Sequence, residues 1–228
     1  MNIATKARLR ALYLRLCDTL HRTAFARPDT TDVGLLVTEI TQPFLPSATL
    51  ESKKHNLREA ARCINVLTIQ PGQVFSFWHA VGNPNNRKRF SEGRSIHHGK
   101  LSLDVGGGLC QASGIIHHLA LLVGLHILER HNHSVDLYAD DARFCPLGSD
   151  ATVFYGFKDL RLRNNLSTPI RLKLIVETDQ LRAQLFAKTS IPTNQLTFQR
   201  TLHDDGTKYV RVTDQQGNVL STSVYESL

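Results

Sequence analysis

Hydrophobic residues near the beginning of the chain recur at helical steps. Leu9, Leu12, Leu16 and Leu20 are three or four positions apart, and Arg or Lys interrupts them every few residues. This pattern predicts a basic amphipathic helix. Two interpretations stay open, a helix docked on the rest of the domain and a helix lying on an anionic membrane surface. The segment lacks the apolar core of a secretory signal, and the chain has no apolar run of about 18 residues that could span a membrane.

Two further segments also have helical periodicity. From about Lys54 to Leu67 the apolar residues fall on one face, which predicts an amphipathic helix. From Gln111 to about Val123 the chain is apolar almost all round, so we expect this helix to be buried. Between them, residues 73–78 ("QVFSFW") predict a short strand, and residues 35–41 ("LLVTEIT") predict another.

The second half of the chain alternates with period two. Residues 170–176 and 181–185 predict two strands joined by a turn at "ETDQ", and a final hairpin is expected around "QQGN". Helices first and strands later favour an α+β fold, with N-terminal helices, a buried central helix after a Gly-rich turn, and a C-terminal, mainly antiparallel sheet. We divide the chain into an amphipathic helix with its connector (1–50), a core domain (51–190) and a β-hairpin extension (191–228).

Composition narrows the class of protein only slightly. The 228 residues carry a net charge of +7, but the basic residues are spread along the chain, so no specific nucleic-acid partner is predicted. The four cysteines are widely spaced without a CxxC pair, which favours a reducing compartment over a disulfide framework. We therefore expect a cytoplasmic protein. A cytoplasmic protein with peripheral contact at the inner face of the membrane is the alternative that stays open.

The stretch "DVGGGLCQ" is the first candidate for chemistry. Gly106, Gly107 and Gly108 suit a tight turn or a nest of N–H groups for an anion, and no Walker sequence follows. Cys110 then falls at the start of the predicted central helix, where unpaired N–H groups and the helix dipole favour a thiolate. A nucleophile is one interpretation and a buried structural cysteine is the other; in the first, Gln111 and the glycine N–H groups would be the oxyanion donors.

The general base must come from elsewhere in the chain. His117 and His118 are too far along the same helix, since seven residues rise about 10 Å. If residues 131–138 form an extended strand, His131 and His133 share a face with Val135 and Leu137, so either histidine is a candidate base. Asp150 is the first choice for the carboxylate that orients the base, and Asp136 is the second.

Two alternatives to catalysis also fit the sequence. Zinc could be held by ligands drawn from His97, His98, Cys110, His131 and His133, although no tight ligand pair supports it, so we expect no cofactor. A non-catalytic module could instead hold an anionic peptide or peptidoglycan precursor, with Arg94, Lys100 and Arg130 meeting its charges. The sequence does not define an oligomeric state.

Three segments together carry a family resemblance. They are "KKHNLREAARCINVLTIQPGQVFSFWHAVGNP", "GGGLCQASGIIHHLALLVGLHILERHNHSVDLY" and "ATVFYGFKDLRLRNN". The chain resembles the VanW family over roughly residues 53–187. The resemblance implies an association with glycopeptide resistance and the bacterial cell envelope, and hence a peptide or peptidoglycan precursor as ligand. Longer members carry membrane anchors and extracellular domains, which this sequence lacks, and this underlies the expectation of a cytoplasmic protein.

Overall fold

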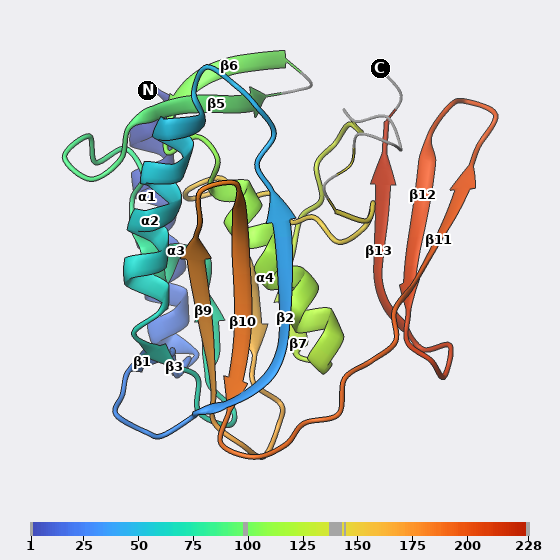
Figure 1. Ribbon diagram of the computed structural model, residues 1–228. Helices are drawn as coiled ribbons and strands as arrows, with labels where there is room; N and C mark the ends of the chain where they lie inside the picture. The colour runs from blue at the N-terminus through green and yellow to red at the C-terminus, as the bar shows by residue number, and fades with distance from the viewer. Residues whose placement is uncertain (1, 98–99, 137–142, 144, 227–228) are drawn as a thin grey trace.

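A computed structural model describes residues 2–97, 100–136, 143 and 145–226. Its helices and antiparallel sheets confirm the predicted α+β class (Figure 1). The central sheet has the order β2–β10–β9, formed by Leu35–Pro43, Gln180–Ala187 and Ile170–Val176. Both pairings are antiparallel, and the tight connection between β9 and β10 lies at the predicted "ETDQ" turn.

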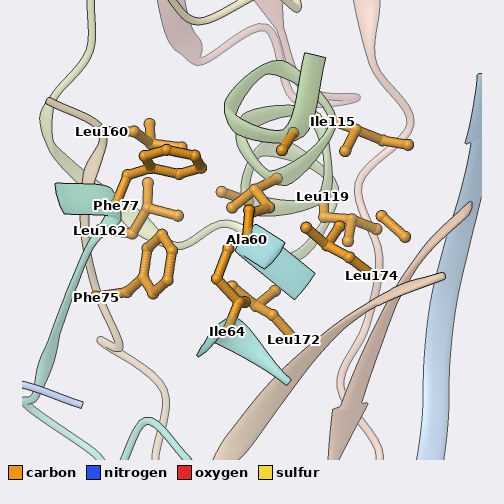
Figure 2. Close-up of a cluster of buried hydrophobic side chains, with 14 of the residues drawn as sticks. Ala60, Ile64, Phe75, Phe77, Ile115, Leu119, Leu160, Leu162, Leu172 and Leu174 are labelled. Carbon is orange, nitrogen blue, oxygen red and sulfur yellow. The ribbon is translucent and has the colours of Figure 1, made fainter. Parts of the chain in front are cut away.

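Helices α2 (Leu50–Ile64) and α4 (Leu109–Val123) build the main core with this sheet. In Figure 1, α2 runs beside β9, and α4 crosses behind β10 and β2. Their apolar faces meet the inward side chains of β9 together with residues of β4 (Val74–Ser76), α3 (Phe77–Val81) and β8 (Arg161–Arg163). Figure 2 shows this packing, with Ala60 of α2 between Phe77 of α3 on one side and Leu119 of α4 on the other.

Three differences from the expected elements have local causes. The second helix ends at Ile64, because Asn65 turns away to exchange hydrogen bonds with the backbone of Leu174, and Leu67–Thr68 pair as β3 with β1 (Arg27–Pro28). The strand predicted over residues 73–78 ends at Ser76, whose hydroxyl caps α3 by accepting from the N–H of His79. The final hairpin is part of a three-stranded sheet, β11–β12–β13, formed by Thr197–Leu202, Lys208–Thr213 and Val219–Tyr225.

A long hairpin precedes α4. Strands β5 (Glu92–His97) and β6 (Lys100–Val105) pair antiparallel and deliver the chain to the glycine turn. After α4, Gly124 takes a left-handed conformation and β7 (His126–Glu129) pairs with β8. The strand predicted to continue through residue 138 ends at Glu129, and residues 137–138 lie outside the described part.

Helix α1 (Ile3–Leu20) lies at one side of the molecule, partly behind α2 in the view of Figure 1. Its N-cap is Asn2, whose side chain accepts from the N–H of Thr5. Across residues 2–97, 100–136, 143 and 145–226, no helix combines the length and apolar character needed to cross a bilayer.

Candidate active site

Cys110 lies in the first turn of α4, directly after the glycine turn. Gly108 precedes the helix with φ = +95°, a conformation that disfavours a side chain. Gly107 packs on Gly93 of β5 so closely that an added Cβ would come 2.3 Å from a Gly93 backbone atom. The sequence therefore needs glycine here to bring the β5–β6 hairpin against the start of α4.

Asn56 of α2 holds this turn in place. Its fully buried side chain donates to the carbonyls of Ser91 and Gly107, both at 3.0 Å, and accepts from the N–H of Ser91 at 2.8 Å. Three hydrogen bonds from one buried amide tie the helix to both sides of the β5–β6 hairpin. Sequence reasoning missed Asn56, because an isolated Asn on a helix face carries no recognisable signal.

The N–H groups around Cys110 divide into two sets. Those of Gly106 and Gly107 donate to the carbonyls of Ser91 and Asp104, so the predicted nest does not offer them to an anion. Within the described residues, the N–H groups of Gly108 and Cys110 donate to no acceptor. These two N–H groups at the N-terminus of α4 are available to an anionic ligand.

Gln111 adds an unusual feature beside the thiol. Its side chain is buried, yet neither its amide nitrogen nor its oxygen has a hydrogen-bond partner among the described residues. Buried polar groups without partners are rare in folded proteins because they lose hydration without compensation. The carboxamide is therefore free to bond a ligand; its role as an oxyanion donor stays a prediction.

His133 and Asp150 meet at the same place. Nδ1 of His133 lies 2.7 Å from Oδ2 of Asp150, which also accepts from the N–H of His133 at 2.8 Å. With Nδ1 held by the carboxylate, the other ring nitrogen is left for the Cys110 thiol, and each of these two groups shifts the pKa of the other. Cys110 also contacts Oγ1 of Thr152 at 3.5 Å. The structure thus brings together Cys110, His133 and Asp150 from three separate segments.

The charges of this group are coupled. Burial raises the pKa of the Cys110 thiol, but the hydrogen bond and positive charge of His133 outweigh it and leave that pKa below its ordinary value. Burial lowers the pKa of His133, whereas Asp150 and Cys110 raise it to about 10. Burial likewise raises the pKa of Asp150, and His133 and Arg130 more than reverse this. The His133 side chain thus favours the thiolate form of Cys110, and Asp150 and Cys110 favour the protonated form of His133.

Arg130 and Tyr225 fix the Asp150 carboxylate. The side chain of Arg130 is only 6% exposed and lies 3.1 Å from Oδ1 of Asp150, while its other donors reach backbone carbonyls and the hydroxyl of Ser223. The sequence analysis expected Arg130 to meet the charges of a ligand. Its side chain instead holds the Asp150 carboxylate. The Tyr225 hydroxyl donates to the same Oδ1. Tyr225 was not predicted, since nothing in its local sequence points to residues about 75 positions earlier.

The other residues considered as the general base, or as the carboxylate that orients it, have partners outside the Cys110–His133–Asp150 group. His131 points to Glu129, with Nε2 3.0 Å from Oε1, because the strand that was to align it with His133 ends at Glu129. Asp136 is paired with Arg143 and Lys208. His117 is fully buried with Nδ1 2.8 Å from the carbonyl of Ser149, and burial lowers its pKa to about 3. His117 is therefore a packing group, as expected.

Two cations border the glycine turn. Lys53 of α2 lies against Gly108, where an added Cβ would come 2.5 Å from its side chain, and Arg94 follows Gly93 in β5. Burial and the nearby charge of Arg94 lower the pKa of Lys53 to about 8. Within the described residues neither cation is paired with a carboxylate. The turn before Cys110 thus carries positive charge suited to an anionic ligand.

A zinc site finds no support in the described residues. They contain no group of three or more His, Cys, Asp or Glu side chains that could hold a metal ion, and His98 lies outside them. His131 bonds the carboxylate of Glu129, and His133 bonds that of Asp150. Cys145 is isolated, and burial raises its pKa to about 11.

The fold and site define an α+β protein with a cysteine at a helix N-terminus beside a histidine that is hydrogen-bonded to an aspartate. Comparison with known proteins gives the family: residues 52–186 match the model described as "VanW like protein", and the chain belongs to the VanW family. It is 32% identical over 137 residues to the vancomycin B-type resistance protein VanW of Enterococcus faecalis, covering 60% of this chain and 50% of the relative.

A second relative is the uncharacterized protein YoaR of Bacillus subtilis. It is 32% identical over 123 residues, covering 54% of this chain and 39% of YoaR. The chain thus spans half or less of the length of these two relatives. No solved structure matches the chain. All of the matched region lies before the C-terminal sheet that contributes Tyr225.

Proposed function

We propose that this VanW-family protein is a thiol-dependent enzyme that cleaves or transfers an acyl group of a peptide or peptidoglycan precursor. The observation that carries the proposal is the Cys110–His133–Asp150 arrangement, in which Asp150 lies 2.7 Å from His133 and His133 lowers the pKa of the Cys110 thiol. The relative named for vancomycin resistance supports an accessory role in glycopeptide resistance or cell-envelope metabolism.

The chemistry follows from the charge state. The Cys110 thiolate attacks a carbonyl carbon, and the carbonyl oxygen takes the negative charge beside the N–H groups of Gly108 and Cys110. The imidazolium of His133 gives its proton to the departing amine, leaving a thioester on Cys110. Water, deprotonated by the now neutral His133, hydrolyses the thioester; an amine acceptor would complete a transfer instead. Asp150 keeps the imidazole oriented through both steps.

The substrate proposed is anionic near the cleaved bond. Lys53 and Arg94 border the glycine turn without carboxylate partners among the described residues, and Gln111 has a free carboxamide. A peptidoglycan stem peptide supplies carboxylates for the cations and amides for the carboxamide. This chemistry suits a peptide ligand better than a neutral sugar.

The thiol is tested by alkylation with iodoacetamide, followed for each cysteine by mass spectrometry. At pH 6 an ordinary thiol with a pKa of about 8.5 is well under 1% ionised, so we expect Cys110 to react at least tenfold faster than N-acetylcysteine under the same conditions. Replacing His133 with Asn should remove most of this advantage. A rate for Cys110 at pH 6 that is no higher than that of N-acetylcysteine would contradict the proposal.

Turnover is tested with a synthetic peptidoglycan stem peptide. The enzyme should release a product and, after acid quench, carry a peptide adduct on Cys110 that Cys110→Ser lacks. The second candidate function is a non-catalytic module that binds the same peptide, which the cations Lys53 and Arg94 favour on their own. Binding that persists unchanged in Cys110→Ala, with no turnover by the unmodified protein, would decide for the module.

A further inference from the structure

Helix α1 contacts the rest of the protein through its small residues. Ala7 is buried, and its carbonyl lies so close to Gly156 that a Cβ on that glycine would come within 2.4 Å. Asp18 pairs with Arg161 on the same side of the helix. At about 100° per residue, Ala7, Ala11 and Asp18 share one face, which is therefore the docked face.

The opposite face of α1 carries the large apolar side chains. Leu9, Leu12, Tyr13, Leu16 and Leu20 follow one another at helical steps and are between 53% and 73% exposed. One of the two interpretations of the leucine periodicity was a helix that docks on the domain, and the leucines were the residues expected to make that contact. The structure instead docks α1 through its alanines and leaves the leucines uncovered, although a contiguous apolar stripe in water is unfavourable.

Basic residues border this stripe on both sides. In projection along the helix, Lys6 and Arg10 flank one edge, and Arg8 and Arg15 flank the other. None of the four pairs with a carboxylate within the described residues, and the acidic residue of the helix, Asp18, is on the docked face. Arg10 also lies over the ring of Phe157 at 5.6 Å, which holds its charge at the edge of the stripe.

We propose that α1 binds an anionic lipid surface, with its leucine face entering the boundary between headgroups and acyl chains. An apolar stripe between two rows of unpaired cations complements a layer of hydrocarbon beneath negative headgroups. A second copy of the chain is a poorer occupant, because joining two leucine faces would bring two sets of four cations together. This proposal is independent of the chemistry at Cys110.

Cosedimentation of the full chain with vesicles tests the proposal. Vesicles of 70% phosphatidylcholine and 30% phosphatidylglycerol should retain the protein at low salt, and vesicles of phosphatidylcholine alone should retain much less. Each positive charge near an anionic surface strengthens binding by about a factor of five. The double variant Arg8→Gln with Arg15→Gln should therefore weaken the affinity for these vesicles on the order of thirtyfold. Leu12→Gln with Leu16→Gln should weaken it by at least tenfold.

The controls separate this surface from general hydrophobicity and from self-association. Leu36→Gln with Leu202→Gln removes two exposed leucines on β2 and β11 and should leave vesicle binding unchanged. Circular dichroism should give the same melting temperature for all three variants, since every changed side chain is exposed. Equal retention by neutral and anionic vesicles, unchanged retention of the Leu12/Leu16 variant, or a dimer abolished by that variant would each overturn the proposal.

Discussion

The Tyr225 hydroxyl donates a hydrogen bond to Oδ1 of Asp150, whose Oδ2 is bonded to His133. Tyr225 is 1% exposed and also accepts from the N–H of Gly148 at 3.0 Å. Burial and the negative charge of Asp150 raise the pKa of the phenol, so it stays protonated and remains a donor. The last strand of the fold thus helps to set the position of the carboxylate that orients the candidate base.

Replacing Tyr225 with Phe should remove one hydrogen bond to Asp150 while the aromatic ring still fills its buried position. We expect the pH midpoint of Cys110 alkylation to rise by a fraction of a unit, and the free energy of unfolding to fall by about 1 kcal/mol. Iodoacetamide kinetics and urea titration measure the two effects. Tyr209→Phe on β12, where the side chain is 41% exposed, is the matched control and should change neither.

The pH dependence of stem-peptide turnover should have two limbs. The reaction needs Cys110 deprotonated and His133 protonated. As the pH falls through the lowered pKa of the thiol, the thiolate is protonated and activity is lost; as the pH rises through about 10, the imidazolium loses its proton and leaving-group protonation fails. Initial rates between pH 5 and 11 test this. A profile that rises only above pH 8.5 would show an ordinary, unassisted thiol.

Asn56→Ala should show whether the hydrogen bonds that hold the glycine turn affect the reactivity of Cys110 in addition to the stability of the fold. The change removes the Asn56 partner of the Ser91 N–H and of the Gly107 carbonyl, while the Ser91 carbonyl keeps the N–H of Gly106, and we expect a loss of about 2–3 kcal/mol in the free energy of unfolding. Because the turn then shifts relative to α4, alkylation of Cys110 at pH 6 should slow severalfold in the protein that remains folded.

The matched control is Asn65→Ala. Asn65 exchanges two hydrogen bonds with the backbone of Leu174, at 2.8 and 2.9 Å, away from the glycine turn. The Asn65→Ala variant should lower the free energy of unfolding by an amount similar to that of Asn56→Ala and leave the alkylation rate of Cys110 unchanged. If both variants slow alkylation equally, Asn56 acts only through overall stability.

Lys53→Met should weaken the binding of an acidic stem peptide while preserving the thiol. The substitution keeps an apolar stem against Gly108 and removes the charge, and we expect KM to rise about tenfold, the effect of losing roughly 1.4 kcal/mol of binding. Lys54→Met is the control, since Lys54 is already paired with Glu51 at 2.9 Å. Steady-state kinetics, or titration calorimetry on Cys110→Ala, measures the difference. Equal effects of both substitutions would assign Lys53 no direct role.

Local patterns in the sequence predicted most of the fold. The burial of α4 followed from its uninterrupted apolar composition, and the β9–β10 hairpin followed from alternation around "ETDQ". Within the site, the position of Cys110 at a helix start and the choice of Asp150 followed from residue types and order. Their catalytic roles stay predictions until the thiol is measured.

The partners that hold the site could not be predicted. Asn56, Arg130 and Tyr225 act through contacts between segments far apart in sequence, and only the packed structure shows which carbonyl or carboxylate each one meets. The shared face predicted for His131 and His133 was wrong for a related reason. Strand alternation assumed that β7 continues, but it ends at Glu129, and the two rings then turn to different carboxylates.

The position of Tyr225 near the end of the described chain has a consequence for biosynthesis. Residues 52–186, which match the family model, are synthesised before β13, so Tyr225 is the last of the groups around Asp150 to be made. The carboxylate gains its last donor only when β13 pairs with β12 and buries Tyr225. The thiol therefore reaches its final electrostatic environment late, once the C-terminal sheet has been synthesised and docked.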